Sequence, residues 1–187
     1  MITTATTGRL PAGYTVRPAE PTDVSGARRV MLNALYRDLR SGYRPEWHAD
    51  VIDIEGAYLR PGRHTLLVAE HDGVVVATAG VRSHGPAHPP NPRWLAERYP
   101  SGSTAQLCRV YVDAAHRRRG LARVMVDRLL DFVTTDPGYR DAYLHTDPVS
   151  PGAEAFWRSL GRVVHDERPT PKGAGTVHFA IELPGRS

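Results

Sequence analysis

The sequence has little sulfur and almost no lysine. Cys108 is the only cysteine, which excludes an internal disulfide and a metal site built from cysteines. Inside an apolar run, it is expected to be a small buried side chain and not a nucleophile. Lys172 is the only lysine among 24 basic residues, so scattered arginines carry the net charge of +4. Nucleic-acid-binding proteins usually concentrate such charge on one face, so we expect no nucleic-acid partner.

Long apolar runs are also missing. No stretch is long enough to span a membrane, so no membrane partner is expected. The segment from Met1 to Gly13 is short and polar, unlike a secretory signal, and a cytoplasmic location is the expectation. We predict a flexible tail over residues 1–13 and a single domain over residues 14–187, a length sufficient to bury a core.

Two common phosphate-binding motifs are absent. No Gly-Lys-Ser/Thr follows a glycine-rich loop, and there is no G-x-G-x-x-G, which excludes a Walker loop and the usual dinucleotide fingerprint. His84 and His88 have the spacing of a metal pair, but glycine and prolines around them disfavour helical presentation. Zinc normally needs three or four placed ligands, so no metal is expected.

The stretch from Ala105 to Leu130 combines a strand, a basic turn and a helix. Residues 116–120 have no apolar side chain, so the chain is predicted to turn there. The strand is predicted from the strand-favouring residues before this turn: Leu107, Val110, Tyr111 and Val112. The helix is predicted from apolar residues that recur every three to four positions after it: Leu121, Met125, Leu129 and Phe132.

Such a unit can bind an anion. The first N–H groups of a helix lack partners within it, and the helix dipole adds partial positive charge there. Gly120 allows close approach of the backbone, and residues 117–119 are all arginine. The alternative is a solvated basic turn before a surface helix.

Two segments resemble the GNAT superfamily of acyl-CoA-dependent N-acetyltransferases. Residues 117–122, RRRGLA, resemble its R/Q-x-x-G-x-G/A signature. Residues 144–146 and 150–161 resemble the family's fifth strand, Asn- or Ser-led turn and helix ending in Leu-Gly. The resemblance implies an α/β fold of mixed α+β character. Its central sheet would be mixed and splayed, with six to seven strands and helices on both faces.

The resemblance also implies a reaction. Acetyl-CoA would lie between the fourth and fifth strands and donate its acetyl group directly to a primary amine of a small molecule or peptide. The residues expected to bind acetyl-CoA are Val110, Tyr111, Val112, Arg117, Arg118, Arg119, Gly120, Leu121, Ala122, Arg123, Ser150 and Trp157. Many family members dimerise, which makes a homodimer an expectation without direct support in this sequence.

The sequence departs from the family at two catalytic positions. Trp157 occupies the place of a tyrosine acid, and an indole cannot serve as that acid. Gln106 occupies the place of a glutamate base, and an amide cannot act as a base. His145 and Tyr111 are the catalytic candidates that we retain, with a water chain as the alternative route for the proton. A hydrogen-bonded histidine beside the sheet is the structural alternative for His145.

These departures keep a second function open, a non-catalytic acyl-CoA-binding sensor or regulatory module. Acidic and aromatic residues between 43 and 62 are candidates for holding a cationic acceptor. The alternative is that Asp50, Asp53 and Glu55 form a solvated helix face while the aromatic residues are core. The proline-rich segment 83–104 is predicted to form a lid or wall over the acceptor site.

The remaining elements follow from periodicity and turn residues. Strands are predicted at residues 14–18, 65–69, 74–81, 140–146, 162–165 and 177–183, with a hairpin at Asp72-Gly73 and a turn at 169–175. Helices are predicted from a cap at Thr22 or Asp23 to Leu39, around residues 50–58, over 93–99, and after Ser150 as a cap.

Overall fold

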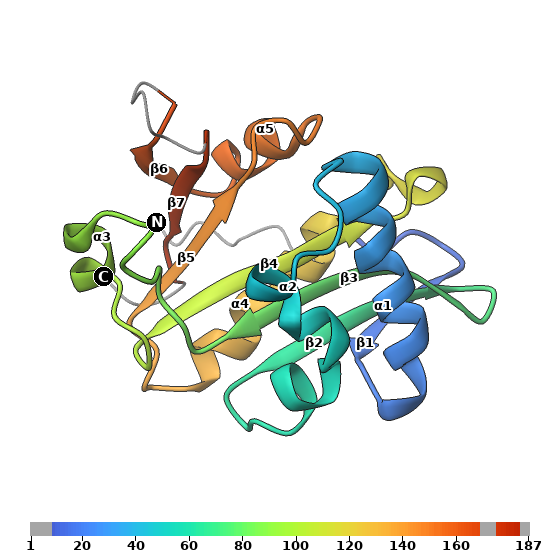
Figure 1. Cartoon of the computed structure of the whole chain (residues 1–187). Helices are drawn as coiled ribbons and strands as arrows, with labels where there is room; N and C mark the ends of the chain where they lie inside the picture. Colours follow the sequence, from blue (N-terminus) through green and yellow to red (C-terminus); the bar gives the residue numbers. More distant parts are fainter. Residues whose placement is uncertain (1–8, 169–174, 184–187) are drawn as a thin grey trace.

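The computed structural model describes residues 9–168 and 175–183. Seven strands form one sheet in the order β1-β2-β3-β4-β5-β7-β6 (Figure 1). The strands are Tyr14–Pro18 (β1), Thr65–His71 (β2), Val74–Arg82 (β3), Thr104–Val112 (β4), Asp141–Thr146 (β5), Arg162–Asp166 (β6) and Val177–Ile181 (β7). Only β4 and β5 pair in parallel, which confirms the predicted mixed sheet.

The sheet is splayed between β4 and β5. Their register covers only three pairs and ends at Gln106 opposite Tyr143, although β4 continues to Val112 and β5 to Thr146. Beyond Gln106, one edge of β4 therefore has no strand partner from β5. Unpaired backbone groups along an edge can accept hydrogen bonds from, or donate them to, a ligand.

Helices cover both faces of the sheet. In Figure 1, α1 and α2 lie in front of the sheet and α4 lies behind it. The α-helices are Val24–Asn33 (α1), Pro45–Ile52 (α2), Arg93–Arg98 (α3), Leu121–Thr135 (α4) and Ala153–Arg158 (α5). Short 3-10 turns cover Pro21–Asp23 (η1) and Ala114–His116 (η4), and π-helical turns cover Ala34–Asp38 (η2) and Glu55–Leu59 (η3).

The first helix departs from the prediction of one continuous α-helix to Leu39. It widens after Asn33 into η2, where the N–H of Leu39 donates to the carbonyl of Ala34, a five-residue step. A side-chain cap at Asp23 is also wrong, because its carboxylate accepts hydrogen bonds from Arg17 and from the backbone of Glu20. Single π-turns occur frequently at functional sites, and η2 borders the cleft described below.

The hairpin between β2 and β3 confirms the strongest turn signal. Asp72 and Gly73 have φ values of 50° and 74°, as a type I′ turn requires of both central residues. The helix predicted at 50–58 is wrong in its bounds. Its place is taken by α2, which begins earlier at Pro45, and by the separate turn η3.

Two apolar layers hold the helices on the sheet. The face of α4 packs behind the strands through Leu121, Met125, Leu129 and Val133. On the other face, Ala27, Val30 and Met31 of α1 pack with Tyr58 of η3 against Leu66, Val68 and Val75. Leu10 packs against the first layer, so part of the predicted tail contacts the domain, while residues 1–8 lie outside the described chain.

The segment ending in Leu160-Gly161 brings α5 close to the sheet. A Cβ added at Gly161 would lie 2.4 Å from the carbonyl oxygen of Ala180 on β7, so only glycine fits without movement. The predicted cap at Ser150 is wrong. Gly152 occupies the N-cap of α5 with φ 78°, and no side chain caps the helix.

The proline-rich segment contains the predicted short helix, here α3. Leu95 and Tyr99 are buried with Tyr143 of β5, and the rings of Tyr99 and Tyr143 lie 5.2 Å apart. Arg98 forms two hydrogen bonds with Asp141. These contacts attach α3 beside β5 (Figure 1). The predicted role as a wall over the acceptor stays a prediction.

Candidate active site

A cleft of about 430 Å³ lies along the unpaired part of β4. It brings together eleven of the twelve residues expected to bind acetyl-CoA: Val110, Tyr111, Val112, Arg117, Arg118, Gly120, Leu121, Ala122, Arg123, Ser150 and Trp157. Arg119 does not line it. Ala34, Asp38 and Leu39 from the first helix also line it. Nothing in their sequence pattern pointed to the cleft, because the π-turn that presents them has no simple periodic signal.

A bulge shapes β4 at the cleft. Arg109 has φ 54°, an uncommon value for a residue with a side chain, and the register with β3 shifts between Thr78 and Gly80. The hydroxyl of Thr78 donates to the carbonyl of Arg109 over 2.8 Å and fixes this turn of the backbone. As a consequence, the Arg109 side chain reaches α2, while Val110 and Val112 line the cleft.

The start of α4 closes one end of the cleft with open backbone donors. Gly120 is the N-cap with φ 80°, no side chain caps the helix, and Arg118 also has a positive φ of 62°. The N–H groups at the start of this 15-residue helix therefore face the cleft without an intrahelical partner. Together with the helix dipole, this geometry suits an anion.

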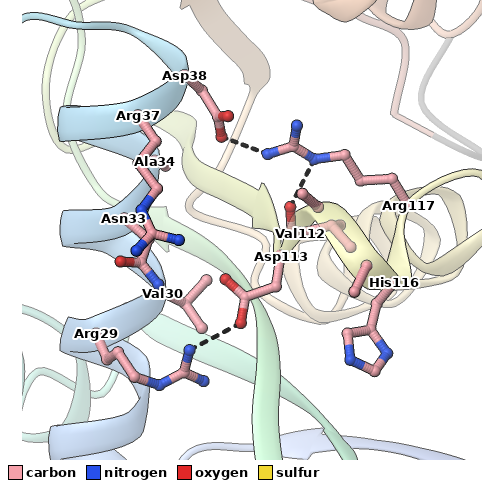
Figure 2. Close-up of a pocket in the computed structure, with 12 residues that line it drawn as sticks. Arg29, Val30, Asn33, Ala34, Arg37, Asp38, Val112, Asp113, His116 and Arg117 are labelled. Atoms are coloured by element: carbon pink, nitrogen blue, oxygen red, sulfur yellow. Dashed lines mark hydrogen bonds and ion pairs between the residues drawn. The ribbon is translucent and has the colours of Figure 1, made fainter.

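The three arginines of the basic turn are not equivalent. Figure 2 shows Arg117 directed at η2, where its guanidinium pairs with Asp38, and its Nε donates to the carbonyl of Val112 over 2.8 Å. Beside it, Arg29 pairs with Asp113 over 2.9 Å. Arg117 therefore attaches the turn to the first helix and to β4. Arg118, by contrast, is exposed in the cleft and forms no ion pair among the described residues.

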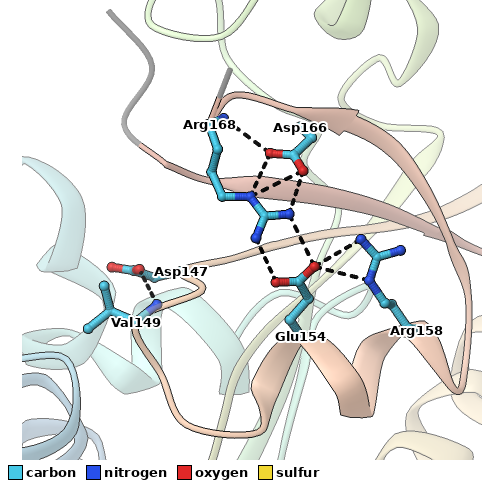
Figure 3. A network of polar contacts seen from close by, with 6 residues as sticks. All are labelled: Asp147, Val149, Glu154, Arg158, Asp166 and Arg168. Carbon is cyan, nitrogen blue, oxygen red and sulfur yellow. Dashed lines mark hydrogen bonds and ion pairs between the residues drawn. The ribbon is translucent and has the colours of Figure 1, made fainter. Parts of the chain in front are cut away.

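The opposite wall of the cleft is the segment from Ser150 to Trp157. Trp157 is buried, with its ring 4.8 Å from that of Phe156, so it packs in the wall. Figure 3 shows how α5 is attached to the end of β6. Glu154 accepts hydrogen bonds from Arg158 and Arg168, and Arg168 also pairs with Asp166.

A buried ion pair lies on the α2 side of the bulge. Arg109 donates to both carboxylate oxygens of Asp50, with Nη2–Oδ1 at 2.6 Å and Nε–Oδ2 at 2.8 Å. The hydroxyl of Tyr58 donates to Oδ2 over 2.5 Å and lies 3.3 Å from Sγ of Cys108. Burial opposes ionisation of Asp50, but hydrogen bonds from Arg109 and Tyr58 outweigh it and lower its pKa to about 2.

This ion pair differs from both interpretations offered for Asp50. The carboxylate is neither on a solvated face nor free to hold an amine, because Arg109 already occupies both of its oxygens. Asp53 is exposed and pairs with Arg60, as a solvated face predicts. Tyr58 is core, while Trp47 is exposed. Asp50 and Arg109 are 59 positions apart, so no local pattern could reveal their contact.

The two catalytic candidates differ in position. Tyr111 lines the cleft, whereas His145 lies on β5 outside its lining. The His145 side chain is exposed, and Arg82 and Arg109 are among the charges acting on it. Desolvation, followed by these charges and His178, lowers its pKa to about 4. The imidazole is therefore neutral at pH 7 and able to accept a proton.

A polar chain behind His145 was not predicted. His178 is fully buried and bridges the hydroxyl of Tyr143, 2.6 Å from Nδ1, and Glu167, 3.2 Å from Nε2. The rings of His145 and His178 lie 6.0 Å apart. In this series of three side chains, each one is the hydrogen-bond partner of the next. The alternation of side chains along β5 and β7 could have placed Tyr143 and His178 on one face of the sheet. It could not have given the register between the two strands.

Lowered histidine pKa values predict acid sensitivity. Desolvation is the first cause at His48, His84, His145 and His178, and each folded-state pKa lies below the unfolded value of about 6.5. Because the side chains of His84 and His145 are exposed, the buried His48 and His178 carry most of the effect. Between these pKa values, protons bind the unfolded chain preferentially. Stability is thus complete above about pH 6.5 and decreases as the pH falls toward 4.

We expect the melting temperature, followed by circular dichroism, to fall progressively between pH 6.5 and pH 4. His145→Gln should make this fall shallower, by a small amount because solvent screens its exposed ring. A melting temperature that is flat across this interval would contradict the prediction.

The described residues span 9–168 and 175–183. They contain no helix with the length and apolarity needed to cross a membrane. Within them, no three histidine, cysteine or acidic residues converge as a set of metal ligands. His84 lies beside His64, with ring centroids 5.5 Å apart, and His88 instead contacts the carbonyl of Asn91.

Comparisons with known proteins agree with this architecture. Residues 32–161 match the model of the acetyltransferase (GNAT) family. N-acetyltransferase 8 of Rattus norvegicus is 34% identical over 115 residues, which is 61% of this chain and 46% of that protein. N-acetylaspartate synthetase of Rattus norvegicus is 30% identical over 114 residues, 61% of this chain and 33% of the relative. The chain thus spans less than half the length of these curated relatives.

Solved structures share the fold at low sequence identity. A Salmonella typhimurium protein, crystallised with its cofactor acetyl-CoA, superposes with a TM-score of 0.64 at 18% identity, covering 94% of this chain and 97% of that one. The mixed sheet of six to seven strands flanked by helices, as predicted from the sequence, is the fold that such structures share.

Proposed function

The chain belongs to the GNAT acetyltransferase family, and from that premise we propose that it transfers an acetyl group from acetyl-CoA to the primary amine of a small molecule or peptide. One observation carries the proposal. The unpaired edge of β4 leads, within one continuous cleft, to the uncapped N-terminus of α4. An extended amide-containing arm and a diphosphate fit these two features in that order.

The described residues fit acetyl-CoA on their own chemistry. Peptide groups of β4 beyond Gln106 can pair with the amides of the pantetheine arm. The first N–H groups of α4, Gly120 and the unpaired Arg118 suit the diphosphate. Acetyl-CoA supplies an activated thioester. The names of the relatives, N-acetyltransferase 8 and N-acetylaspartate synthetase, both specify acetylation on nitrogen. They therefore support nitrogen as the acceptor atom here.

Two tasks remain for the protein. An ammonium must lose a proton before it can attack, and the developing oxyanion needs a donor, for which the bulged backbone near Val110 is the candidate. We propose His145 as the proton acceptor, because it presents an exposed imidazole on β5 that is neutral at pH 7. Its lowered pKa makes it a weak base, so its contribution depends on its position next to the amine. Tyr111 is the second candidate because it lines the cleft. Gln106 cannot act as the base, and Trp157 cannot act as an acid.

Replacing His145 with glutamine is expected to lower kcat by about 100-fold, since a positioned base contributes at least that much. Acetyl-CoA affinity should stay unchanged, because His145 does not line the cleft. Steady-state kinetics and calorimetry would measure the two quantities. An unchanged kcat would exclude His145 as the base, and Tyr111→Phe would then distinguish Tyr111 from a water chain.

The proposed function is tested by titrating the purified protein with acetyl-CoA in a calorimeter, then measuring thiol release with a panel of amines. Binding followed by amine-dependent release is the expected result. Binding without release from any amine would favour the second function, a non-catalytic acyl-CoA sensor, which Gln106 and Trp157 support. Absence of acetyl-CoA binding would refute both.

A further inference from the structure

Arg82 is a half-buried arginine for which the described chain provides no counter-ion. Its Nε is fully buried without a hydrogen-bond partner, and among the described residues the guanidinium forms no ion pair. Its one specific contact is with the ring of Tyr58, 5.9 Å away. A buried polar group without a partner is costly, so an arginine without a counter-ion among the described residues is a candidate for binding an anionic ligand.

The neighbours of Arg82 leave its charge uncompensated. Asp50 is the nearby carboxylate, and Arg109 and Tyr58 already occupy it. Burial raises the pKa of both the Tyr58 hydroxyl and the Cys108 thiol, so these groups are neutral at pH 7. His145 is neutral as well. Within this group of neighbours, the charges of Arg82, Arg109 and Asp50 leave one positive charge.

The strand register places Arg82 at the point where the sheet opens. Arg82 is opposite Gln106, and Gln106 is the last residue of β4 that pairs with β5. The contact with Tyr58 shows that the Arg82 side chain lies on the α2 side of the sheet, and its charge acts on His145. Val110 is only four residues, roughly 13 Å, further along β4.

We propose that Arg82 binds a carboxylate of the acceptor, so that the substrate is an amine that also carries a carboxylate group, such as an amino acid. This inference rests on the proposed function and names its substrate class. A guanidinium can bind a carboxylate through two parallel hydrogen bonds. The carboxylate would pair with the terminal nitrogens of the half-buried guanidinium, because its Nε is itself buried, and it would direct the amine toward the bulge of β4.

The test compares acceptors that differ only near the carboxylate: L-phenylalanine, its amide and 2-phenylethylamine. Dipeptides with a free or amidated C-terminus distinguish a peptide acid from a free amino acid. Each is assayed by thiol release with wild-type protein, Arg82→Met and Arg82→Lys. Arg60→Met is the matched control, because this exposed arginine pairs with the exposed Asp53 and does not line the cleft.

We expect Arg82→Met to lower kcat/KM for carboxylate-bearing amines by about 10- to 100-fold, the loss typical of a hydrogen bond to a charged group. The amide and 2-phenylethylamine should change by less than about threefold, and Arg82→Lys should retain part of the preference. Acetyl-CoA affinity should stay the same in all variants. If no amine is turned over, the same compounds are titrated into the protein–CoA complex, where the same dependence on Arg82 is expected.

Two results would overturn the inference. One is a wild-type protein that treats amines with and without a carboxylate alike, in turnover or in binding; the proposed function would survive this if any amine were acetylated. The other is a melting temperature more than about 4 °C lower in ligand-free Arg82→Met, since this would show a structural role. Because no direct ion pair is lost, we expect the melting temperature of that variant to stay within this limit.

Discussion

Replacing Gly120 with glutamate is expected to weaken acetyl-CoA binding by about 1000-fold or more. Gly120 caps α4 at φ 80°, with open space where a side chain would begin, so the new carboxylate would extend next to the helix N-terminus. Two like charges about 4 Å apart at a protein surface repel by about 4 kcal/mol, which corresponds to a factor of 1000 in affinity. Isothermal titration with acetyl-CoA measures the change.

Gly102 offers a matched control for this variant. It has φ 90°, also with nothing within 4 Å of an added Cβ, but it lies in the turn before β4 and does not line the cleft. Gly102→Glu should therefore carry the same backbone strain and the same charge without affecting the cofactor. Equal losses of affinity in the two variants would contradict the assignment of the diphosphate to α4.

The second large effect concerns stability. Asp50→Leu is expected to lower the free energy of unfolding by about 3–5 kcal/mol, because it leaves the Arg109 guanidinium buried without its counter-ion. Urea unfolding followed by tryptophan fluorescence would measure this loss. The double variant Asp50→Leu/Arg109→Met should recover most of it, since well-packed apolar side chains can replace a buried ion pair.

Asp53→Leu is the control for Asp50→Leu. Asp53 also pairs with an arginine, but both side chains are exposed and their N–O distance is 3.4 Å. Exposed pairs contribute at most about 1 kcal/mol, so this variant should unfold nearly as the wild type does. A double variant no more stable than Asp50→Leu alone would show that the loss has another origin, such as the hydrogen bond from Tyr58.

Local sequence patterns predicted the scaffold of the site well. The Asp72-Gly73 hairpin, the strand–turn–helix unit ending in α4 and the short α3 depend on turn residues and periodicity, and all three are present. The cleft could also be anticipated, since most of its lining comes from two continuous segments whose motifs were recognisable. Whether those residues bind acetyl-CoA stays a prediction.

Other parts of the site depend on tertiary contacts. The ion pair of Asp50 with Arg109 and the chain from Tyr143 to Glu167 join residues far apart in sequence, so composition and spacing carry no record of them. The sequence predicts that Arg117 binds acetyl-CoA, but its guanidinium pairs with Asp38 from the first helix. This tertiary contact could not be read from the sequence either. The predicted caps at Asp23 and Ser150 are wrong for two different reasons. Arg17 and the backbone of Glu20 occupy the Asp23 carboxylate, and Gly152 is the N-cap of α5 in place of Ser150.

The bulge at Arg109 limits how this protein can be re-engineered. Its backbone forms part of the cleft wall, and its side chain holds α2 through Asp50. The segment from 43 to 62 is thus not an interchangeable module. A chimera that imports this segment from another family member must bring a carboxylate at the position of Asp50, or replace Arg109 at the same time. Libraries that randomise the acceptor side should keep these two positions as a linked pair.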